Sequence, residues 1–163
     1  MKKIIFVVAL MASMVANAQI YSGKGDQKVQ IGADFQDGAT GIQGSYDYGI
    51  AQNFSIGLGV NYALGLDDSI DADFDERATL KLRFNANIGD VINIDPMFDV
   101  YPGLHFSSKS FGGHLGARYF FTDGFGIFSE AAFPLAKYKT EDLTPSEELY
   151  NQFTVALGLA FNF

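Results

Sequence analysis

The sequence contains no cysteine and no tryptophan, and it has only two histidines and four prolines among its 163 residues. Without cysteine the chain has no disulfide framework and no thiol chemistry, so an exported form must be held together by its sheet or by its surroundings. Basic residues are also scarce, with 11 Lys and Arg against 19 Asp and Glu. Because proteins bind nucleic acid by neutralising phosphates with Lys and Arg, this balance argues against a nucleic-acid partner.

The first 18 residues are predicted to be a secretory signal peptide. A charged start, Lys2 and Lys3, precedes an apolar run that ends in the small-x-small cleavage site Ala16-Asn17-Ala18. The run is shorter than the roughly 20 residues that a spanning helix needs. Gln19 follows the predicted cut, so the cysteine that anchors a lipoprotein is not present.

The remaining residues, 19–163, have a length that suits a single domain. Loss of two lysines and no acid leaves 9 basic against 19 acidic residues, a net charge of −10. The chain is rich in glycine and aromatic residues, with 18 Gly, 16 Phe and 8 Tyr. Such a mixture favours strands joined by turns over helices.

Apolar and polar residues alternate along the whole mature chain, in segments of about ten residues separated by turn residues. The closing stretch, NQFTVALGLAFNF, shows this clearly, because every second residue back from Phe163 is apolar and those between are small or polar. We predict eight strands, over residues 26–35, 41–50, 54–63, 78–88, 97–106, 111–121, 125–133 and the closing stretch. Pro102 cannot donate a ladder hydrogen bond, so we expect a bulge or weak pairing there, and the pattern leaves the register of its strand open.

The connections differ in length. Those after the third and seventh strands run to about fifteen residues and are acidic and polar (64–77 and 134–149), whereas the others are shorter. Asp37-Gly38 and Asp123-Gly124 are typical of tight turns. No segment has a clear 3.6-residue period, although residues 146–149 have the composition of a single helical turn.

Two orientations of these strands are possible. Apolar faces turned inward would give a secreted, soluble, lipocalin-like binding barrel. Apolar faces turned outward are favoured, because the polar faces hold many glycines and alanines, which a crowded eight-strand interior requires. Those faces also carry charges of both signs that can pair inside a closed barrel: Lys28, Asp34, Asp47, Lys81, Arg83, Asp99, Arg118 and Glu130.

Aromatic residues cluster near the predicted strand ends, as they do in the girdles of membrane barrels. In hydrocarbon each unpaired backbone N–H or C=O costs several kcal/mol, so strands cross a bilayer only as a closed cylinder without edges. The sequence therefore predicts an all-β fold, an eight-stranded antiparallel up-and-down transmembrane β-barrel surrounded by outer-membrane lipid.

The final Gly158-Leu159-Ala160-Phe161-Asn162-Phe163 resembles the C-terminal insertion signal of Gram-negative outer-membrane proteins. In that signal a glycine is followed by two aromatics at alternate positions, here Phe161 and Phe163; Ala156 departs from the polar residue often found at its place. The eight-strand pattern is similar to that of small OmpA/OmpX-type barrels. The resemblance implies the outer membrane of a Gram-negative bacterium, recognition by the barrel assembly machinery and closure of the last strand against the first, but no specific activity.

The acidic stretch Asp71-Ala72-Asp73-Phe74-Asp75 is similar to the start of a calcium-binding EF-hand loop. The remainder of the loop does not fit, because Glu76 stands where glycine is needed and Leu82 where the last glutamate is needed. We therefore interpret it as a solvated acidic loop, with weak divalent-cation binding as the alternative.

The two histidines, His105 and His114, are predicted to face inward near one end of a hairpin. Two imidazoles without a third ligand make a poor metal site, so we interpret them as a hydrogen-bonded pair in the barrel interior. Ser107, Ser108 and Ser110 lie beside them, but no acid is placed to orient either histidine. No catalytic residue, metal or cofactor is therefore predicted, and the protein is not expected to be an enzyme.

The interior of an eight-stranded cylinder is just wide enough to be filled by side chains. We therefore predict an ion-paired plug in a protein with a structural or surface-interaction role. The alternatives are a narrow channel for small solutes and the secreted soluble barrel described above. Neither a surface partner, a ligand nor an oligomeric state is indicated by the sequence.

Overall fold

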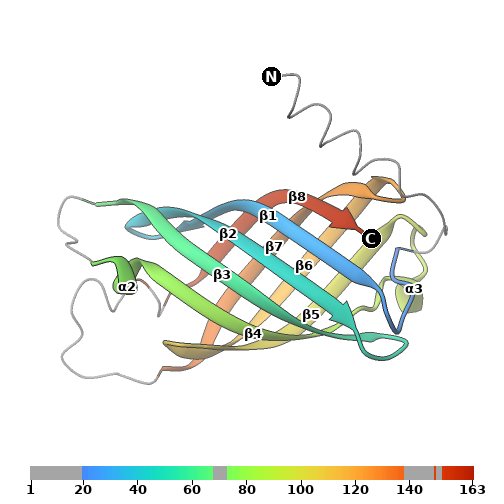
Figure 1. Ribbon diagram of the computed structural model, residues 1–163, viewed down its shortest axis with the longest axis horizontal. Coiled ribbons are helices and arrows are strands. Elements are labelled where there is room, and N and C mark those ends of the chain that lie inside the picture. The colour runs from blue at the N-terminus through green and yellow to red at the C-terminus, as the bar shows by residue number, and fades with distance from the viewer. Residues whose placement is uncertain (1–19, 68–72, 138–148, 150–151) are drawn as a thin grey trace.

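The computed structural model describes residues 20–67, 73–137, 149 and 152–163. In these residues eight antiparallel strands follow one another around a closed barrel, which β8 completes by pairing with β1 (Figure 1). The predicted fold class is thereby confirmed. The signal peptide predicted over residues 1–18 and the helical turn predicted at 146–149, apart from Leu149, lie outside the described residues.

The strands are longer than predicted where they approach the two long connections. They are β1 (Gln27–Gln36), β2 (Ala39–Gly49), β3 (Phe54–Leu66), β4 (Ala78–Ala86), β5 (Phe98–Ser107), β6 (Ser110–Thr122), β7 (Phe125–Lys137) and β8 (Thr154–Asn162). Leu66 still pairs with Ala39, and Lys137 with Ser110, so the connections predicted to begin at 64 and 134 begin later. Two short helices, α2 (Phe74–Arg77) and α3 (Gly89–Ile92), lie in connections, and no helix in the described ranges is long and apolar enough to cross a membrane.

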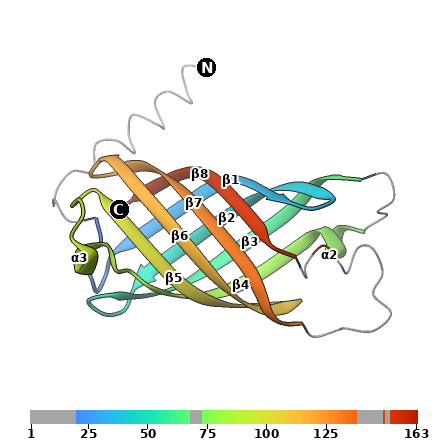
Figure 2. The same cartoon turned by 180° about the vertical axis from the view of Figure 1, so that it is seen from behind.

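The two ends of the barrel differ. One end, here called the loop end, carries α2, the β1–β2 and β5–β6 turns and the ends of β3 and β7 (left in Figure 1, right in Figure 2). The opposite end, here called the turn end, carries the links 50–53, 87–97 and 123–124, together with α3 and the last residue of the chain. Successive strands therefore cross the barrel in opposite directions, as the up-and-down topology requires.

The outer surface of the barrel is apolar. Exposed side chains include Ile31, Ile42, Leu58, Val60, Leu80, Leu82, Leu104, Phe106, Leu115, Ile127, Leu157 and Leu159. Near the turn end Tyr119, Phe121, Phe125 and Phe161 form a continuous row with ring centroids 5.6, 6.3 and 5.7 Å apart. Such a row of exposed rings is typical of the interfacial girdles of membrane barrels. A soluble barrel with an apolar interior is excluded, because it would show the reverse arrangement.

The strand that contains Pro102 keeps its predicted faces. Pro102 pairs with Leu115 of β6 without a shift in register. On the other side, the ladder with β4 covers only residues 81–85 and stops at Gly103. The expected weak pairing is thus confirmed beside the proline, where the N–H is missing. The described register shifts lie elsewhere, at Thr40/Gly41, Phe111/Gly112 and Phe120/Thr122.

The last strand closes the barrel. Phe161 lies opposite Val29 of β1 on one side and Phe125 of β7 on the other. Gly158 lies directly opposite Gly32, and a Cβ atom added to Gly158 would meet the backbone of β1. This close approach explains why the closing strand needs glycine at that position.

Candidate functional site

The structure places all eight predicted interior charges on the inner face of the barrel, called the lumen here. Seven of them are buried, and Lys81 is half-buried beside a cavity near the loop end. Alternation along each strand puts these side chains inside, because successive residues point to opposite faces. Long charged side chains from different strands then fill the cylinder in three groups.

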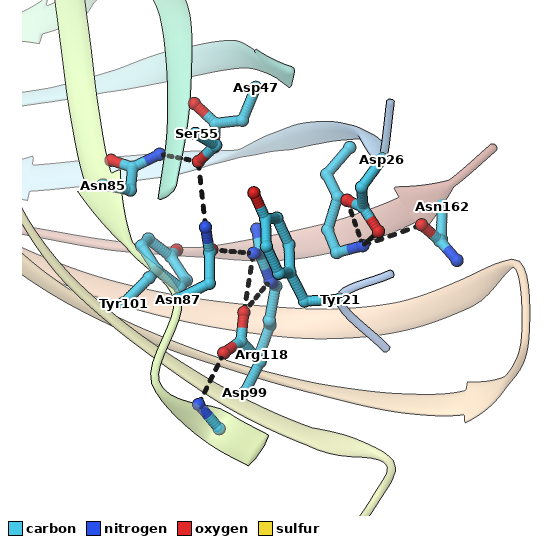
Figure 3. A network of polar contacts seen from close by, with 12 residues as sticks. Tyr21, Asp26, Asp47, Ser55, Asn85, Asn87, Asp99, Tyr101, Arg118 and Asn162 are labelled. Carbon is cyan, nitrogen blue, oxygen red and sulfur yellow. Dashed lines mark hydrogen bonds and ion pairs between the residues drawn. The ribbon is translucent and has the colours of Figure 1, made fainter. Parts of the chain in front are cut away.

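The group at the turn end is built around Arg118 of β6 (Figure 3). Its guanidinium donates through Nε and Nη2 to one oxygen of Asp99, at 3.0 and 2.7 Å, and through Nη2 to the side chain of Asn87 at 2.7 Å. The same guanidinium lies over the ring of Tyr101, 4.5 Å from its centroid. The other oxygen of Asp99 accepts the backbone N–H of Gly89, at 3.0 Å, and so holds α3 against the barrel mouth. The charge is paired, stacked and only 1% exposed.

Lys28 of β1 makes a second ion pair at the same end. Its ammonium donates to both oxygens of Asp26, at 2.6 and 2.8 Å, and to Asn162 of β8 at 2.8 Å. Asp26 was not among the charges predicted to lie inside the barrel. A signal was available, because Asp26 and Lys28 are two residues apart and therefore share one face of an extended chain.

The segment before β1 closes the mouth at the turn end. The Tyr21 hydroxyl donates to the carbonyl of Phe54 at 2.6 Å, with the carbonyl of Ala51 at 3.2 Å. Burial of this hydroxyl, with the Asp26 carboxylate nearby, raises the pKa of Tyr21 to about 12. Ile20 packs into an apolar cluster with Phe120, Phe128, Ala156 and Ala160. No sequence signal predicted this, since the segment precedes the alternating pattern.

Arg83 of β4 occupies the middle of the lumen. It donates to both oxygens of Glu130 on β7, at 2.9 and 2.7 Å, in a planar two-point contact. Its Nε atom also lies 3.3 Å from a carboxylate oxygen of Asp47 on β2. One cation therefore ties three strands together across the interior, in the geometry that guanidinium and carboxylate groups favour.

Asp34 lies between this middle group and the loop end. One of its oxygens accepts a hydrogen bond from Asn61 at 2.7 Å, while the other has no partner among the described residues. Lys81 is a cationic neighbour of both Asp34 and Glu130. Together the middle of the lumen holds three carboxylates and two cations, with Asp47 and Arg83 completing the set.

A cavity of about 50 Å³ opens on the loop end. It has room for roughly three to five water molecules. Asp34, Thr79, Lys81 and His105 contribute polar atoms to its wall, and Leu149 contributes apolar surface. Thr79 is buried and its hydroxyl has no partner among the described residues. The lumen thus retains a small polar space at the loop end.

The two histidines face each other in the lumen. Their Nδ1 atoms are 3.3 Å apart, and Nε2 of His114 lies 2.7 Å from Oδ1 of Asn85. The neighbouring serines do not join them. Ser107 donates to the carbonyl of Ser110 at 2.8 Å and accepts the backbone N–H of Ser110 at 2.7 Å, so it holds the β5–β6 turn.

The acidic loop is only partly described, since Asp71 lies outside the described residues. Asp73 is the N-cap residue of α2, and its backbone N–H donates to the side chain of Glu76 at 3.0 Å. The carbonyl of Asp75 accepts a hydrogen bond from Lys109 at 2.9 Å. Within the described ranges no three His, Cys, Asp or Glu side chains are grouped to hold a metal ion.

Comparison with known proteins places the fold among membrane barrels. The structure is similar to the designed protein reported as "De novo design of transmembrane beta-barrels", with a TM-score of 0.58, 13% identity, and coverage of 86% of this chain and 97% of that chain. It is also similar to the N-terminal β-barrel domain of Pseudomonas aeruginosa OprF, with a TM-score of 0.56, 15% identity and coverage of 86% and 99%. For the outer membrane protein OprG of Pseudomonas aeruginosa the TM-score is 0.51, the identity 11% and the coverage 89% and 99%.

At these identities the likeness shows the fold alone, that of a small OmpA/OmpX-type barrel. None of the curated proteins matches the sequence. A model of the family described as "Family of unknown function (DUF6646)" matches residues 11–163.

Proposed function

The chain belongs to the DUF6646 family of unknown function, and we propose that it is a small integral outer-membrane protein with a structural or surface-interaction role. One observation carries the proposal: the closed barrel buries its charged residues and exposes its aliphatic and aromatic residues. That arrangement is favourable only where hydrocarbon surrounds the cylinder, because in water a wide apolar surface would be exposed to solvent.

The lumen of this protein is closed by its own side chains. Support comes from the Arg83–Glu130 contact in the middle and the Arg118–Asp99 contact at the turn end. At the same end the apolar cluster around Ile20 lies beside Lys28, whose ammonium is 5.7 Å from the centroid of the Phe120 ring. Breaking these contacts to admit a solute would leave charges without partners in a poorly hydrated interior, which is costly.

The route to the membrane follows from the two ends of the sequence. We propose that residues 1–18 direct export and are removed, and that the barrel assembly machinery of a Gram-negative bacterium recognises the closing strand through Gly158, Phe161 and Phe163. The loop end then faces the outside of the cell and the turn end faces the periplasm. Outer-membrane lipid is the partner of the apolar surface, and no catalytic role is assigned.

Fractionation tests this proposal. The protein is expected in the outer-membrane fraction, to be released only by detergent, and to run faster on a gel without boiling than after boiling, because a closed barrel resists the detergent. Recovery in the periplasm or the medium without detergent would contradict the proposal. The same preparation shows whether the folded form is present for the further measurements.

A narrow channel is the second candidate function, and the polar cavity at the loop end is the observation that favours it. Planar-bilayer recordings separate the two functions. A closed lumen predicts that purified, folded protein gives no reproducible discrete conductance. Regular single-channel steps would favour the channel. Variants of Arg83 and Arg118 would then show whether the middle group or the turn-end group limits the conductance.

A further inference from the structure

The two histidines of this chain are brought together by paired glycines. In the β5–β6 ladder His105 lies opposite Gly112, and His114 lies opposite Gly103. A Cβ atom on either glycine would meet the imidazole of the histidine opposite. Each ring therefore occupies the space that a side chain on the facing strand would fill. The two rings lie nearly end to end, with their Nδ1 atoms facing each other, their centroids 5.5 Å apart and an interplanar angle of 30°.

The hydrogen bonds around His114 determine which of its nitrogens has a free lone pair. Asn85 donates its amide group to Ser55 at 3.1 Å, which leaves its oxygen facing Nε2 of His114. An amide oxygen only accepts hydrogen bonds, so Nε2 carries the hydrogen and Nδ1 is bare. Metal-binding histidines are held in the same way, by donation of the other ring N–H to an oxygen.

We propose that His105 and His114 bind one divalent transition-metal ion through their Nδ1 atoms. The separation of these atoms is 3.3 Å. Two nitrogens that lie 2.0–2.1 Å from one ion at a tetrahedral angle are about 3.3 Å apart. In the part of the chain that the structure describes, no third His, Cys, Asp or Glu joins them, so water completes the coordination.

The charged groups around the pair carry both signs. Lys81 and Arg83 lie close to the pair and oppose a positive ion. The carboxylates of the same part of the lumen, from Asp34, Asp47 and Glu130, outnumber these two cations by one. Among these carboxylates Glu130 acts on both imidazoles and favours a bound ion, and it also neutralises Arg83.

The site has an entry path and a preferred class of ion. His105 forms part of the wall of the cavity at the loop end, so ions and the waters that complete the coordination reach the pair from that side. Imidazole ligands suit Cu²⁺, Ni²⁺ and Zn²⁺, and among these Cu²⁺ binds most tightly to a given nitrogen site. This inference does not depend on whether the lumen conducts, because it uses only the pair and the cavity beside it.

Copper titration of the folded, detergent-solubilised protein, carrying no histidine tag, tests the proposal. Because the chain has only two histidines and no cysteine, nitrogen coupling from two imidazoles in the electron paramagnetic resonance spectrum identifies the ligands. We expect one Cu²⁺ per chain, with affinity at least tenfold lower in His105→Gln and in His114→Gln. Asp75→Asn, on the exposed acidic loop, is the matched control and is expected to bind as the unchanged protein does.

Unchanged copper affinity in the double histidine variant, or a spectrum without imidazole coupling, would overturn the proposal. A second measurement covers the case in which the variants do not fold. Nitrogen NMR of the unaltered protein with labelled histidine is expected to show the Nε2–H form of His114 and to shift both Nδ1 resonances when Zn²⁺ is added. Resonances that stay in place at saturating Zn²⁺ would show a hydrogen-bonded pair only, and the site would be rejected.

Discussion

Arg83 of β4 and Glu130 of β7 meet across the barrel interior in two nearly parallel hydrogen bonds, 2.9 and 2.7 Å long. They are separated by 47 positions in the chain, and their side chains are 3% and 4% exposed. A buried contact of this kind is strong between the ions but follows a large cost of removing both from water. Removal of one charged partner alone is therefore more destabilising than replacement of the charged partners together by uncharged residues.

The first prediction concerns this pair. Glu130→Gln is expected to lower the free energy of unfolding by about 3 kcal/mol, because Arg83 keeps a buried charge with only Asp47 beside it. The triple variant Arg83→Met, Glu130→Leu and Asp47→Asn, which removes the cation together with both of its carboxylate partners, is expected to recover most of that loss. Urea unfolding in lipid vesicles, followed by circular dichroism since the chain has no tryptophan, measures both. Additive losses in the triple variant would show that the three residues are not coupled.

A second prediction tests which face meets lipid. Leu82 is 47% exposed on the outer surface, between Leu58 and Phe106 of the adjoining strands. Leu82→Arg is expected to cost about 2–4 kcal/mol of folding free energy if residue 82 lies near the bilayer midplane. Lys81→Ser, one residue away but on the inner face, is expected to cost much less. Equal tolerance of the two changes in a vesicle-folding assay would reverse the assignment of the faces.

The third prediction concerns the segment before β1 and its dependence on pH. Tyr21→Phe removes the hydrogen bond to the carbonyl of Phe54 and is expected to cost about 1 kcal/mol near neutral pH. The pKa of Tyr21 is raised from 10.0 to about 12, so the neutral form is favoured by folding. The stability that it provides is present below pH 10 and is lost as the pH rises toward 12.

The measurement compares unfolding free energies of the unchanged protein and Tyr21→Phe from pH 8 to pH 12. The gap between them is expected to narrow above pH 10, because only the unchanged protein has the phenol to ionise. A gap that stays constant to pH 12 would mean that the Tyr21 hydroxyl is not held in the barrel mouth.

The fourth prediction concerns the closing strand. Phe163→Ser is expected to reduce severalfold the amount of heat-modifiable barrel in the outer-membrane fraction, because the last aromatic belongs to the proposed insertion signal. Phe153→Ser removes an equally exposed ring from outside that signal and serves as the control. If the two variants assemble to the same extent, the assembly machinery does not recognise the side chain of Phe163.

Much of the fold was predictable because each residue of a spanning strand meets one of two very different surroundings. Lipid on one side and a narrow polar interior on the other impose a two-residue period. That period correctly assigned the faces even in β5, where Pro102 interrupts the ladder with β4. The same two-residue period predicted that both histidines face the lumen, but it did not predict the distance between them.

The partners within the lumen were not predictable in the same way. Lys28 pairs with Asp26, which is a near neighbour in sequence, whereas Arg83 pairs with a residue three strands away around the barrel. The alternation of apolar and polar residues did not predict that Ile20 and Tyr21 enter the barrel mouth. The helical turn α3 was also missed, because four residues are too few to show a helical period.

The sequence by itself determined the number of strands, the outward-facing side of each strand and the strand charges enclosed by the barrel, though not Asp26 before the first strand. Each of these depends on the local surroundings of one residue and its immediate neighbours. Only the tertiary structure decided which enclosed charges pair, where a polar cavity remains and that the Nδ1 atoms of His105 and His114 lie 3.3 Å apart. Those relationships depend on strand register and stagger, which closure of the whole cylinder sets between residues far apart in the chain.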